Sequence, residues 1–320
     1  MHRRRMTTIA VLLGTVTLLR CAIGAVRQAE FPIGSIRWAG LERTYRIHVP
    51  PSYDKTRPMP LVIALHGGGG TGEKMEKLSL GGFNTLSDKE GFVVVYPDGI
   101  KRHWNDGRSA EETGWQAHKE NIDDVGLMSA LIDYFIKELN IDKGRVYVTG
   151  ISNGALMSYR LACELTGKIA AIAPVAGTMA NNLYPHCSPS RAISLLAIHG
   201  TKDPLAPWEG GLRGFAGKKL GRALSVADTF KYWKTHNRCP SASVITYEPD
   251  KNPQDGTKVR REVYSGCKDG TEVILYAIEG GGHTWPNGYQ YLPELLVGKT
   301  SKDIDANEVI WNFFKTHSLK

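Results

Sequence analysis

Short apolar runs alternate along the chain with amphipathic segments, as in proteins where strands and helices alternate. Apolar runs of strand length occupy 61–65, 92–96, 145–149, 169–174, 193–198 and 273–278, and an earlier strand is predicted over 44–49. Helices are predicted over 82–90, 124–140, 224–236 and 303–316. Unbroken apolar strands are typical of a parallel sheet that is buried on both faces. The pattern therefore predicts one α/β domain, with a doubly wound, mostly parallel sheet and helices on both faces.

The first 25 residues have a different pattern, which is that of an export signal. Arg3, Arg4 and Arg5 are followed by an apolar stretch over 7–19 and by small residues over 22–25. The apolar stretch is short for a bilayer span, so we expect 1–25 to be a signal peptide and 26–320 to be a single domain. An uncleaved anchor is the alternative. No second apolar stretch of spanning length follows, so the processed chain is expected to be secreted or periplasmic, without stable membrane insertion.

Charge and composition exclude several function classes. The formal net charge is +8, but four arginines and no acids lie within 1–25, which leaves +4 for the processed chain. The Lys and Arg residues are dispersed, so nothing indicates a nucleic-acid partner. The sequence also lacks the paired Cys or His spacing of a metal site, and we expect neither a metal nor a cofactor. It does not indicate an oligomeric state.

Four cysteines remain after the predicted signal peptide: Cys163, Cys187, Cys239 and Cys267. An even number in an oxidising compartment indicates disulfides, and four cysteines allow three pairings. We favour pairing the first two and the last two, because each bond then closes a local loop. Four free, buried thiols are the alternative.

A Gly-x-Ser-x-Gly motif over 150–154 lies between the strand at 145–149 and an apparent helix. In this context the turn is sharp and strained, and it exposes the hydroxyl of Ser152. A serine hydroxyl is a weak nucleophile and needs a neighbouring base. The motif therefore predicts Ser152 as a catalytic nucleophile, against an incidental serine in a glycine-rich turn.

The base and its orienting acid are expected from loops at the same sheet edge. His283 lies in a glycine-rich loop after the strand at 273–278, and Asp203 follows the strand at 193–198. Active sites of open α/β sheets lie where parallel strands end. The resulting chain order of Ser152, Asp203 and His283 is that of α/β-hydrolases. A structural loop histidine and a turn aspartate are the alternatives.

An oxyanion hole is the third requirement of such a site. The main-chain N–H of Asn153 directly follows the nucleophile and supplies one donor. The second donor is predicted in the glycine run after His66, where we assign it to Gly68. Tryptophans in loops, among them Trp104, Trp208 and Trp285, are candidates for an aromatic substrate-binding wall, with ordinary packing as the alternative.

Several segments together resemble the secreted esterase family that includes polyhydroxybutyrate depolymerases and bacterial feruloyl esterases of the carbohydrate-esterase type. The matching segments are PLVIALHGGGG (60–70), GFVVVYPDG (91–99), DDVGLMSALID (123–133), RVYVTGISNGALMSYRLACE (145–164), AAIAPVAG (170–177), HGTKD (199–203) and GGGHTWPNG (280–288). The resemblance implies an α/β-hydrolase fold, with Ser152 as nucleophile, Asp203 as acid and His283 as base. It also implies oxyanion donors in the HGG turn and at Asn153.

The resemblance leaves the substrate to be chosen within the family. Many of its depolymerases carry Cys or Ser where this chain has Gly68, and those that act on solid polymer typically add a linker and a substrate-binding domain. We therefore expect a serine carboxylesterase that hydrolyses feruloyl or acetyl esters of plant cell-wall polysaccharide through an acyl-enzyme. A polyhydroxybutyrate depolymerase is the first alternative. An acyltransferase or a non-catalytic glycan-binding protein on the same fold are the others.

Overall fold

The computed structural model describes residues 33–215 and 217–319, which belong to one compact unit. The predicted signal peptide, residues 1–25, lies outside the described residues, so its cleavage stays a prediction. Within the described part of the chain, no helix has the length and apolar character needed to cross a bilayer.

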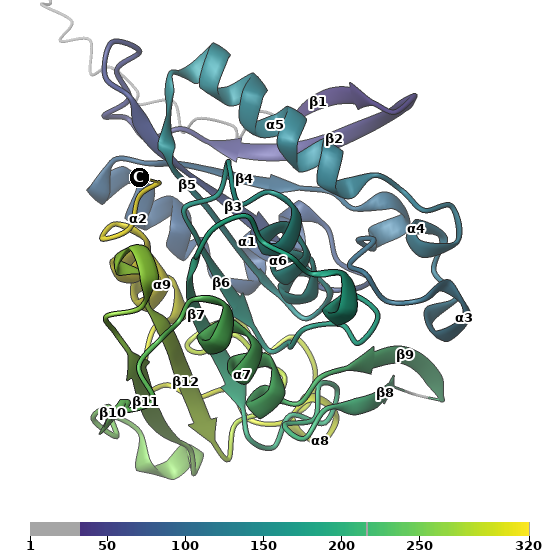
Figure 1. Cartoon of the computed structure of the whole chain (residues 1–320), viewed down its shortest axis with the longest axis vertical. Coiled ribbons are helices and arrows are strands. Elements are labelled where there is room, and N and C mark those ends of the chain that lie inside the picture. The colour runs from purple at the N-terminus through teal and green to yellow at the C-terminus, as the bar shows by residue number, and fades with distance from the viewer. Residues whose placement is uncertain (1–32, 216, 320) are drawn as a thin grey trace, which may run out of the picture. The chain divides into compact units, whose positions relative to one another are not determined.

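A twisted sheet of ten strands forms the centre of this unit (Figure 1). Its strands, in spatial order, are β1 (Ile33–Trp38), β2 (Leu41–His48), β4 (Val93–Pro97), β3 (Met59–Leu65), β5 (Ile141–Ile151), β6 (Ala171–Val175), β7 (Ser194–Gly200), β12 (Val273–Glu279), β11 (Lys258–Tyr264) and β10 (Val244–Tyr247). The six strands from β4 to β12 run parallel, whereas the two at each end pair antiparallel. The predicted doubly wound, mostly parallel sheet is confirmed.

Helices cover both faces of the sheet. One face carries α5 (Asp124–Leu139), α6 (Asn153–Glu164) and α7 (Val226–His236) (Figure 1). The other carries α1 (Gly72–Leu78), α2 (Gly82–Glu90) and α9 (Ala306–Phe314). Short helices α3 (Ala110–Thr113), α4 (Gln116–Lys119) and α8 (Glu294–Val297) lie in the connections, with single 3₁₀ turns at Ile100–Arg102, Tyr184–His186, Pro253–Asp255 and Lys268–Gly270.

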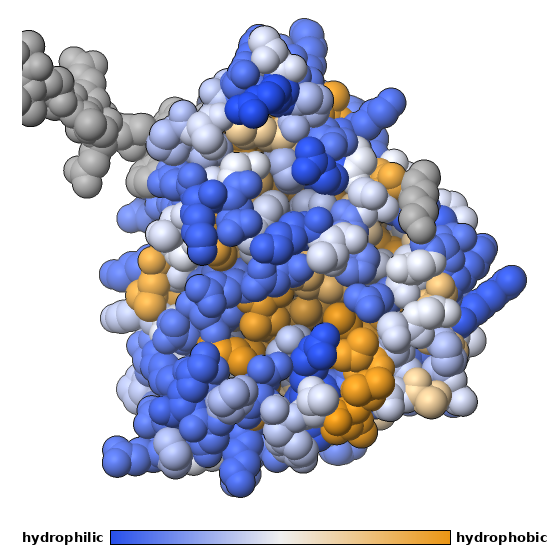
Figure 2. Space-filling view, turned by 90° about the vertical axis from the view of Figure 1, so that its left-hand side faces the viewer, coloured by the Kyte–Doolittle hydropathy of each residue, from blue (hydrophilic) through white to orange (hydrophobic). Residues whose placement is uncertain are grey.

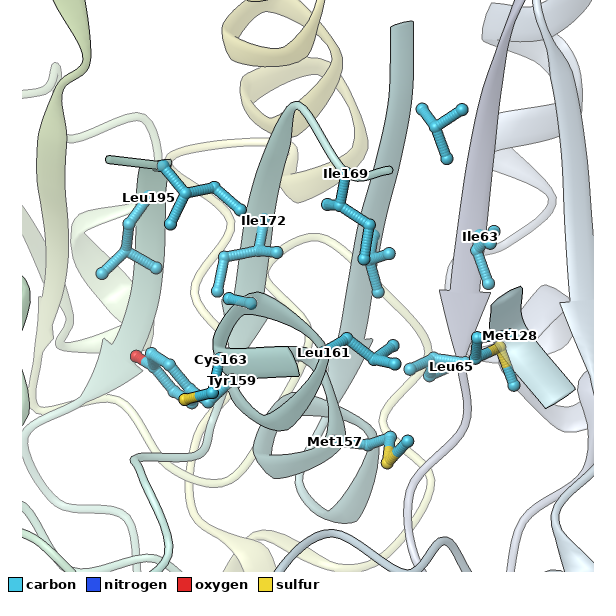
Figure 3. Close-up of a cluster of buried hydrophobic side chains, with 14 of the residues drawn as sticks. Ile63, Leu65, Met128, Met157, Tyr159, Leu161, Cys163, Ile169, Ile172 and Leu195 are labelled. Carbon is cyan, nitrogen blue, oxygen red and sulfur yellow. The ribbon is translucent and has the colours of Figure 1, made fainter. Parts of the chain in front are cut away.

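The alternation of side chains along β3 explains why both faces need helices. Leu61, Ile63 and Leu65 point into the core beneath α5 and α6, whereas Val62 and Ala64 point into the core beneath α1, α2 and α9. Figure 3 shows part of the first core, in which Leu161 of α6 and Met128 of α5 lie near Leu65. On the side of the molecule in Figure 2, hydrophilic side chains dominate and hydrophobic ones gather in one main patch. The helices thus bury apolar strands that would otherwise face water.

Five strands were not expected from the sequence: β1, β10 and β11 of the large sheet, and the two strands of a separate hairpin. The strands β1, β10 and β11 lie at or beside the edges, where short, partly exposed strands lack continuous apolar runs. The hairpin formed by β8 (Gly211–Phe215) and β9 (Lys218–Ala223) lies in a segment for which no strand was predicted. Its glycines and lysines are typical of a loop, which is why the composition did not indicate strands.

Two disulfides join the four cysteines, and both favoured pairings are confirmed. Cys163 bonds Cys187 and Cys239 bonds Cys267, with sequence separations of 24 and 28 residues. The first bond attaches the last turn of α6 to the segment before β7. The second attaches the loop after α7 to the turn between β11 and β12.

Replacing Cys163 and Cys187 together by alanine is expected to lower the free energy of unfolding by about 3 kcal/mol, because the unfolded chain loses a closed loop of this length. Urea unfolding followed by circular dichroism measures the change. The Cys239/Cys267 double variant serves as the matched comparison, since its loop is of similar length. An unchanged unfolding midpoint would contradict a stabilising role for this disulfide.

Candidate active site

Ser152 occupies the turn between β5 and α6 in a strained main-chain conformation. Its φ of 57° and ψ of −115° are unusual for a residue with a side chain. Its N–H donates to Val175 O on the neighbouring strand at 3.0 Å, which fixes the turn against the sheet. The side chain is partly exposed, whereas the residues on either side are buried. The strand–turn–helix context predicted for the motif is therefore present.

Both glycines of the motif are required by close packing. A side chain at Gly154 would collide with the main-chain oxygens of Leu65 and His66, and one at Gly150 would collide with the main chain of Gly154. The helix therefore packs directly on the end of β3. This contact brings the start of α6 next to the glycine run that follows β3.

His283 and Asp203 form a buried pair at the same edge of the sheet. Their closest atoms, Nδ1 of His283 and Oδ2 of Asp203, are 2.7 Å apart, and both side chains are nearly inaccessible to solvent. The other carboxylate oxygen of Asp203 accepts from the N–H groups of Leu205 and Ala206 at 2.8 and 2.7 Å. With Nδ1 donating to the carboxylate, Nε2 of His283 is the atom left to exchange a proton.

Two adjacent loops, bonded to each other, position Asp203 and His283. Asp203 follows β7 and His283 follows β12, which pair in parallel. The loops are bonded to each other, since Lys202 N–H donates to Gly281 O at 2.9 Å and Gly280 N–H donates to Thr201 Oγ1 at 2.9 Å. The acid and the histidine are therefore positioned by one connected loop pair.

The charge of Asp203 is stabilised despite its burial. Burial alone would raise the pKa of the carboxyl group, but His283, His199 and main-chain donors outweigh it and hold the pKa below its usual range. The group is thus a carboxylate at neutral pH. It can stabilise a positive charge on the His283 ring.

Two further histidines near the site, His66 and His199, have structural partners. His66 Nε2 accepts from Gly99 N–H at 2.9 Å and its Nδ1 bonds Gly67 O at 2.8 Å, so it orders the glycine turn. Burial lowers the pKa of His66 to about 4, so the ring is neutral. His199 is buried and its Nε2 bonds Ala206 O at 2.8 Å, beside the acid.

The glycine run after β3 lies against Ser152. A Cβ added to Gly67 would be 3.5 Å from Ser152 Cβ, so the turn passes directly beside it. The amides of Gly69 and Gly70 donate to Arg102 O and Gly67 O at 2.8 and 2.9 Å. Gly68 is exposed, and its amide stays the predicted second oxyanion donor. Asn153 begins α6, where main-chain N–H groups favour negative charge.

Two of the three tryptophans predicted for a substrate wall are instead in the core. Trp104 and Trp285 are both fully buried. The Trp104 indole donates to His66 O at 3.0 Å, and the Trp285 indole donates to Asn307 Oδ1 at 3.2 Å. The prediction is wrong for these two residues, because their position in loops does not reveal their burial. Trp208 is partly exposed, with its ring 5.9 Å from that of His199.

Trp115, another of the loop tryptophans, lies beside the glycine run. A Cβ added to Gly68 would lie 3.3 Å from Cη2 of Trp115 and 3.4 Å from Cδ2 of His103. The two aromatic rings are themselves 4.0 Å apart between centroids, and both are partly exposed. His103 was not expected at the site, and the signal that could have found it is its loop, which follows β4 at the same sheet edge as the serine turn. No group of three metal-ligating side chains occurs among residues 33–215 and 217–319.

The fold and the order of these loops define an α/β-hydrolase. Solved structures agree with the fold: an acetyl xylan esterase from Aspergillus awamori superposes with a TM-score of 0.54 at 19% identity, covering 79% of this chain and 94% of that one. A thermostable esterase superposes with a TM-score of 0.55 at 16% identity, covering 90% of this chain and 63% of that one.

Sequence relatives specify the family. Residues 43–207 match the family described as esterase PHB depolymerase, and the chain belongs to this family. NocK of Nocardia uniformis subsp. tsuyamanensis, provisionally named an esterase, is 30% identical over 86% of this chain and 80% of its own length. Feruloyl esterase B of Piromyces equi is 29% identical over 76% of this chain, but the match spans only 42% of that enzyme. Feruloyl esterase D of Neurospora crassa is 25% identical over 76% of this chain and 74% of its own length. The chain is a carboxylic ester hydrolase.

Proposed function

We propose that the protein is a secreted serine esterase that hydrolyses feruloyl or acetyl esters of plant cell-wall polysaccharide. The observation that carries the catalytic part is the buried 2.7 Å contact between His283 and Asp203, at the edge of the sheet where Ser152 occupies the strained turn. The names of the relatives, feruloyl esterases among them, support the substrate class.

The reaction proceeds through an acyl-enzyme. Nε2 of His283 takes the hydroxyl proton as Ser152 Oγ attacks the ester carbonyl carbon, and the carbonyl oxygen becomes an oxyanion. The main-chain N–H groups of Asn153 and Gly68 donate to that oxyanion. The tetrahedral intermediate then expels the alcohol, whose oxygen takes the proton from His283. Water repeats both steps, which releases the acid and restores Ser152.

An aromatic acyl group fits the surroundings of the oxyanion turn. Trp115 and His103 pack against Gly68, so an acyl group whose carbonyl oxygen reaches Gly68 N–H lies next to two rings. Planar rings gain from stacking on such a surface. The missing side chain at Gly68 keeps both rings close to the turn. These contacts favour a hydroxycinnamoyl acyl group over an aliphatic one.

A polyester depolymerase is the second candidate function. It is favoured by the description of the family that residues 43–207 match, esterase PHB depolymerase. A 3-hydroxybutyrate oligomer has an aliphatic acyl group and would gain less from the Trp115 and His103 rings.

Secretion is supported by the two disulfides, which are typical of oxidising compartments.

We expect methyl ferulate to be hydrolysed with a higher kcat/KM than a 3-hydroxybutyrate oligomer, an acetylated xylo-oligosaccharide or p-nitrophenyl acetate. The panel is measured with residues 26–320, and product is quantified by chromatography with and without a sugar acceptor. Preference for the hydroxybutyrate oligomer would assign the protein to the depolymerases. Transfer of the acyl group to the acceptor in place of water would make it an acyltransferase.

Within the same panel, Trp115→Ala distinguishes a loss of acyl-group binding from a loss of the catalytic reaction itself. It should lower kcat/KM for methyl ferulate by roughly fivefold, since an aromatic contact contributes about 1 kcal/mol, and change p-nitrophenyl acetate hydrolysis little. Tyr134→Ala is the control, because Tyr134 is a partly exposed ring on α5 that packs against Phe135. Equal losses for both substrates would contradict a role of Trp115 in acyl binding.

A further inference from the structure

A buried carboxylate outside the proposed catalytic residues lies next to the oxyanion site. Asp106 is completely inaccessible to solvent, in the loop that follows β4. It accepts from Asn153 Nδ2 at 2.5 Å, from Arg108 Nε at 3.0 Å, and it bonds His118 Nε2 at 3.0 Å. Nothing in the proposed reaction uses this group directly.

The side chain of Asn153 is held on three sides by the same loop. Its Oδ1 accepts from Trp104 N–H at 2.8 Å, and its Nδ2 donates to Trp104 O at 3.1 Å as well as to Asp106. Asn153 carries the main-chain N–H that follows the nucleophile. The three bonds therefore restrict the first residue of α6 through its side chain.

The loop also holds the other half of the oxyanion site. The Trp104 indole donates to His66 O at 3.0 Å, and its ring lies 4.8 Å from that of His66. His66 in turn bonds Gly67 O at the start of the glycine turn. One short segment, Trp104–Asp106, thus connects the turn that carries Gly68 with the helix start that carries Asn153.

The charge on Asp106 strengthens this connection. Burial alone would raise the pKa of the group, but Arg108 and His118 outweigh it and hold the pKa well below its usual range. Hydrogen bonds to an ionised acceptor are shorter and stronger than neutral ones. Arg108 is in turn covered by the Trp115 ring, whose centroid is 4.6 Å from the guanidinium carbon.

We propose that Asp106 is a positioning residue for the oxyanion hole, which it fixes through Asn153 and the adjoining Trp104. The inference rests on the proposed function. Donors that are already aimed at the developing charge lower the barrier because they need no reorganisation during the reaction. Asp106 acts on the transition state and not on binding of the ground-state ester.

The test is Asp106→Asn in the otherwise unchanged protein, with p-nitrophenyl acetate as substrate. We expect kcat to fall on the order of 10- to 100-fold, with KM changed by less than about threefold. Affinity for an aryl trifluoromethyl ketone, which forms a tetrahedral adduct with a serine, should fall by a similar factor. A kcat within threefold of the parent would overturn the proposal, as would an unchanged affinity for the ketone.

Asn153→Ala is the second variant, because it removes the amide side chain and keeps the main-chain N–H. It should reproduce the loss in kcat and in ketone affinity, and adding Asp106→Asn should cause little further loss, since both act through one contact. If Asp106→Asn does not fold, Asn153→Ala alone tests the proposal, and an unchanged kcat in that variant would overturn it. The proposal would also be overturned if the losses in kcat of the two single variants were fully additive in the double variant.

Asn237→Ala controls for simple destabilisation. Asn237 is also completely buried, and its amide likewise bonds the N–H and C=O of a single residue, Ile193, at 3.2 and 2.7 Å. This contact lies at the start of β7, at the edge opposite the site. The variant should lower the melting temperature without changing kcat or ketone affinity, and an equal kcat loss would overturn the proposal. An inactive parent protein would instead contradict the proposed function itself.

Discussion

Ser152→Ala is expected to lower kcat for p-nitrophenyl acetate and methyl ferulate by about 10⁴-fold or more. Without Oγ there is no atom to form the acyl-enzyme, so His283 could only act on water, while the oxyanion donors would still support a small residual rate. Alanine keeps the size of the turn residue to within one atom. The positive φ of the turn is imposed by the packing of Gly150 and Gly154, which the variant retains.

Initial rates at high enzyme concentration, together with a circular dichroism melting curve, measure this effect. Ser158→Ala is the matched control, because Ser158 lies on the same helix and its hydroxyl bonds only Gly154 O, at 2.8 Å, among the described contacts. The control should retain most of the activity. Comparable turnover by the Ser152 variant and the parent would show that another residue is the nucleophile.

Asp203→Asn is expected to lower kcat on the order of 10³- to 10⁴-fold. The amide can still accept from Leu205 and Ala206, but it removes the negative charge that stabilises a protonated His283 ring and selects its Nδ1–H tautomer. Asp303→Asn is the control, because Asp303 is equally buried and accepts from two main-chain N–H groups, those of Lys251 and Asn252. Equal losses in the two variants would contradict a specific role for Asp203.

The same variant should also change the response of stability to acid. The pKa of Asp203 is lower in the folded protein than its usual value near 4, so the ionised group stabilises the fold above about pH 4. That contribution is lost as the pH falls toward the folded-state pKa. Urea unfolding between about pH 5 and pH 3 should therefore show a smaller decrease in stability for Asp203→Asn than for the parent. Parallel curves would contradict the lowered pKa.

The sequence allowed the central strands to be predicted because they are apolar on both faces. β3 is buried at every position, and a short unbroken apolar run of this kind is typical of a strand that is covered on both faces. The edge strands could not be predicted in the same way. All four residues of β10 are exposed, and β11 contains a run of charged residues, so neither has a pattern that distinguishes a strand from a loop.

Some residues of the candidate site could likewise be predicted from the sequence, and others could not. Ser152, Asp203 and His283 could be proposed together because parallel strands end at one edge, so residues far apart in sequence share a location. The sequence could not show which loop tryptophan lies beside the glycine run, since Trp104 and Trp115 lie in the same loop and only contacts distinguish them. Trp104 is buried against His66, whereas Trp115 lies over Gly68. The sequence did not indicate the proposed role of Asp106 either, because that role depends on a contact with the side chain of Asn153.

The bonded loop pair that carries Asp203 and His283 has a consequence for loop exchange between relatives. Gly200 has no room for a side chain because the main-chain oxygens of Gly281 and Gly282 press against it. A graft that replaced only one of these loops would break the shared hydrogen bonds, so the two must be transplanted as a unit. The loop with Trp115 and the β8–β9 hairpin meet elsewhere, through Arg108 and Leu220 O. Exchanges in that second region should therefore leave the contact between Asp203 and His283 intact.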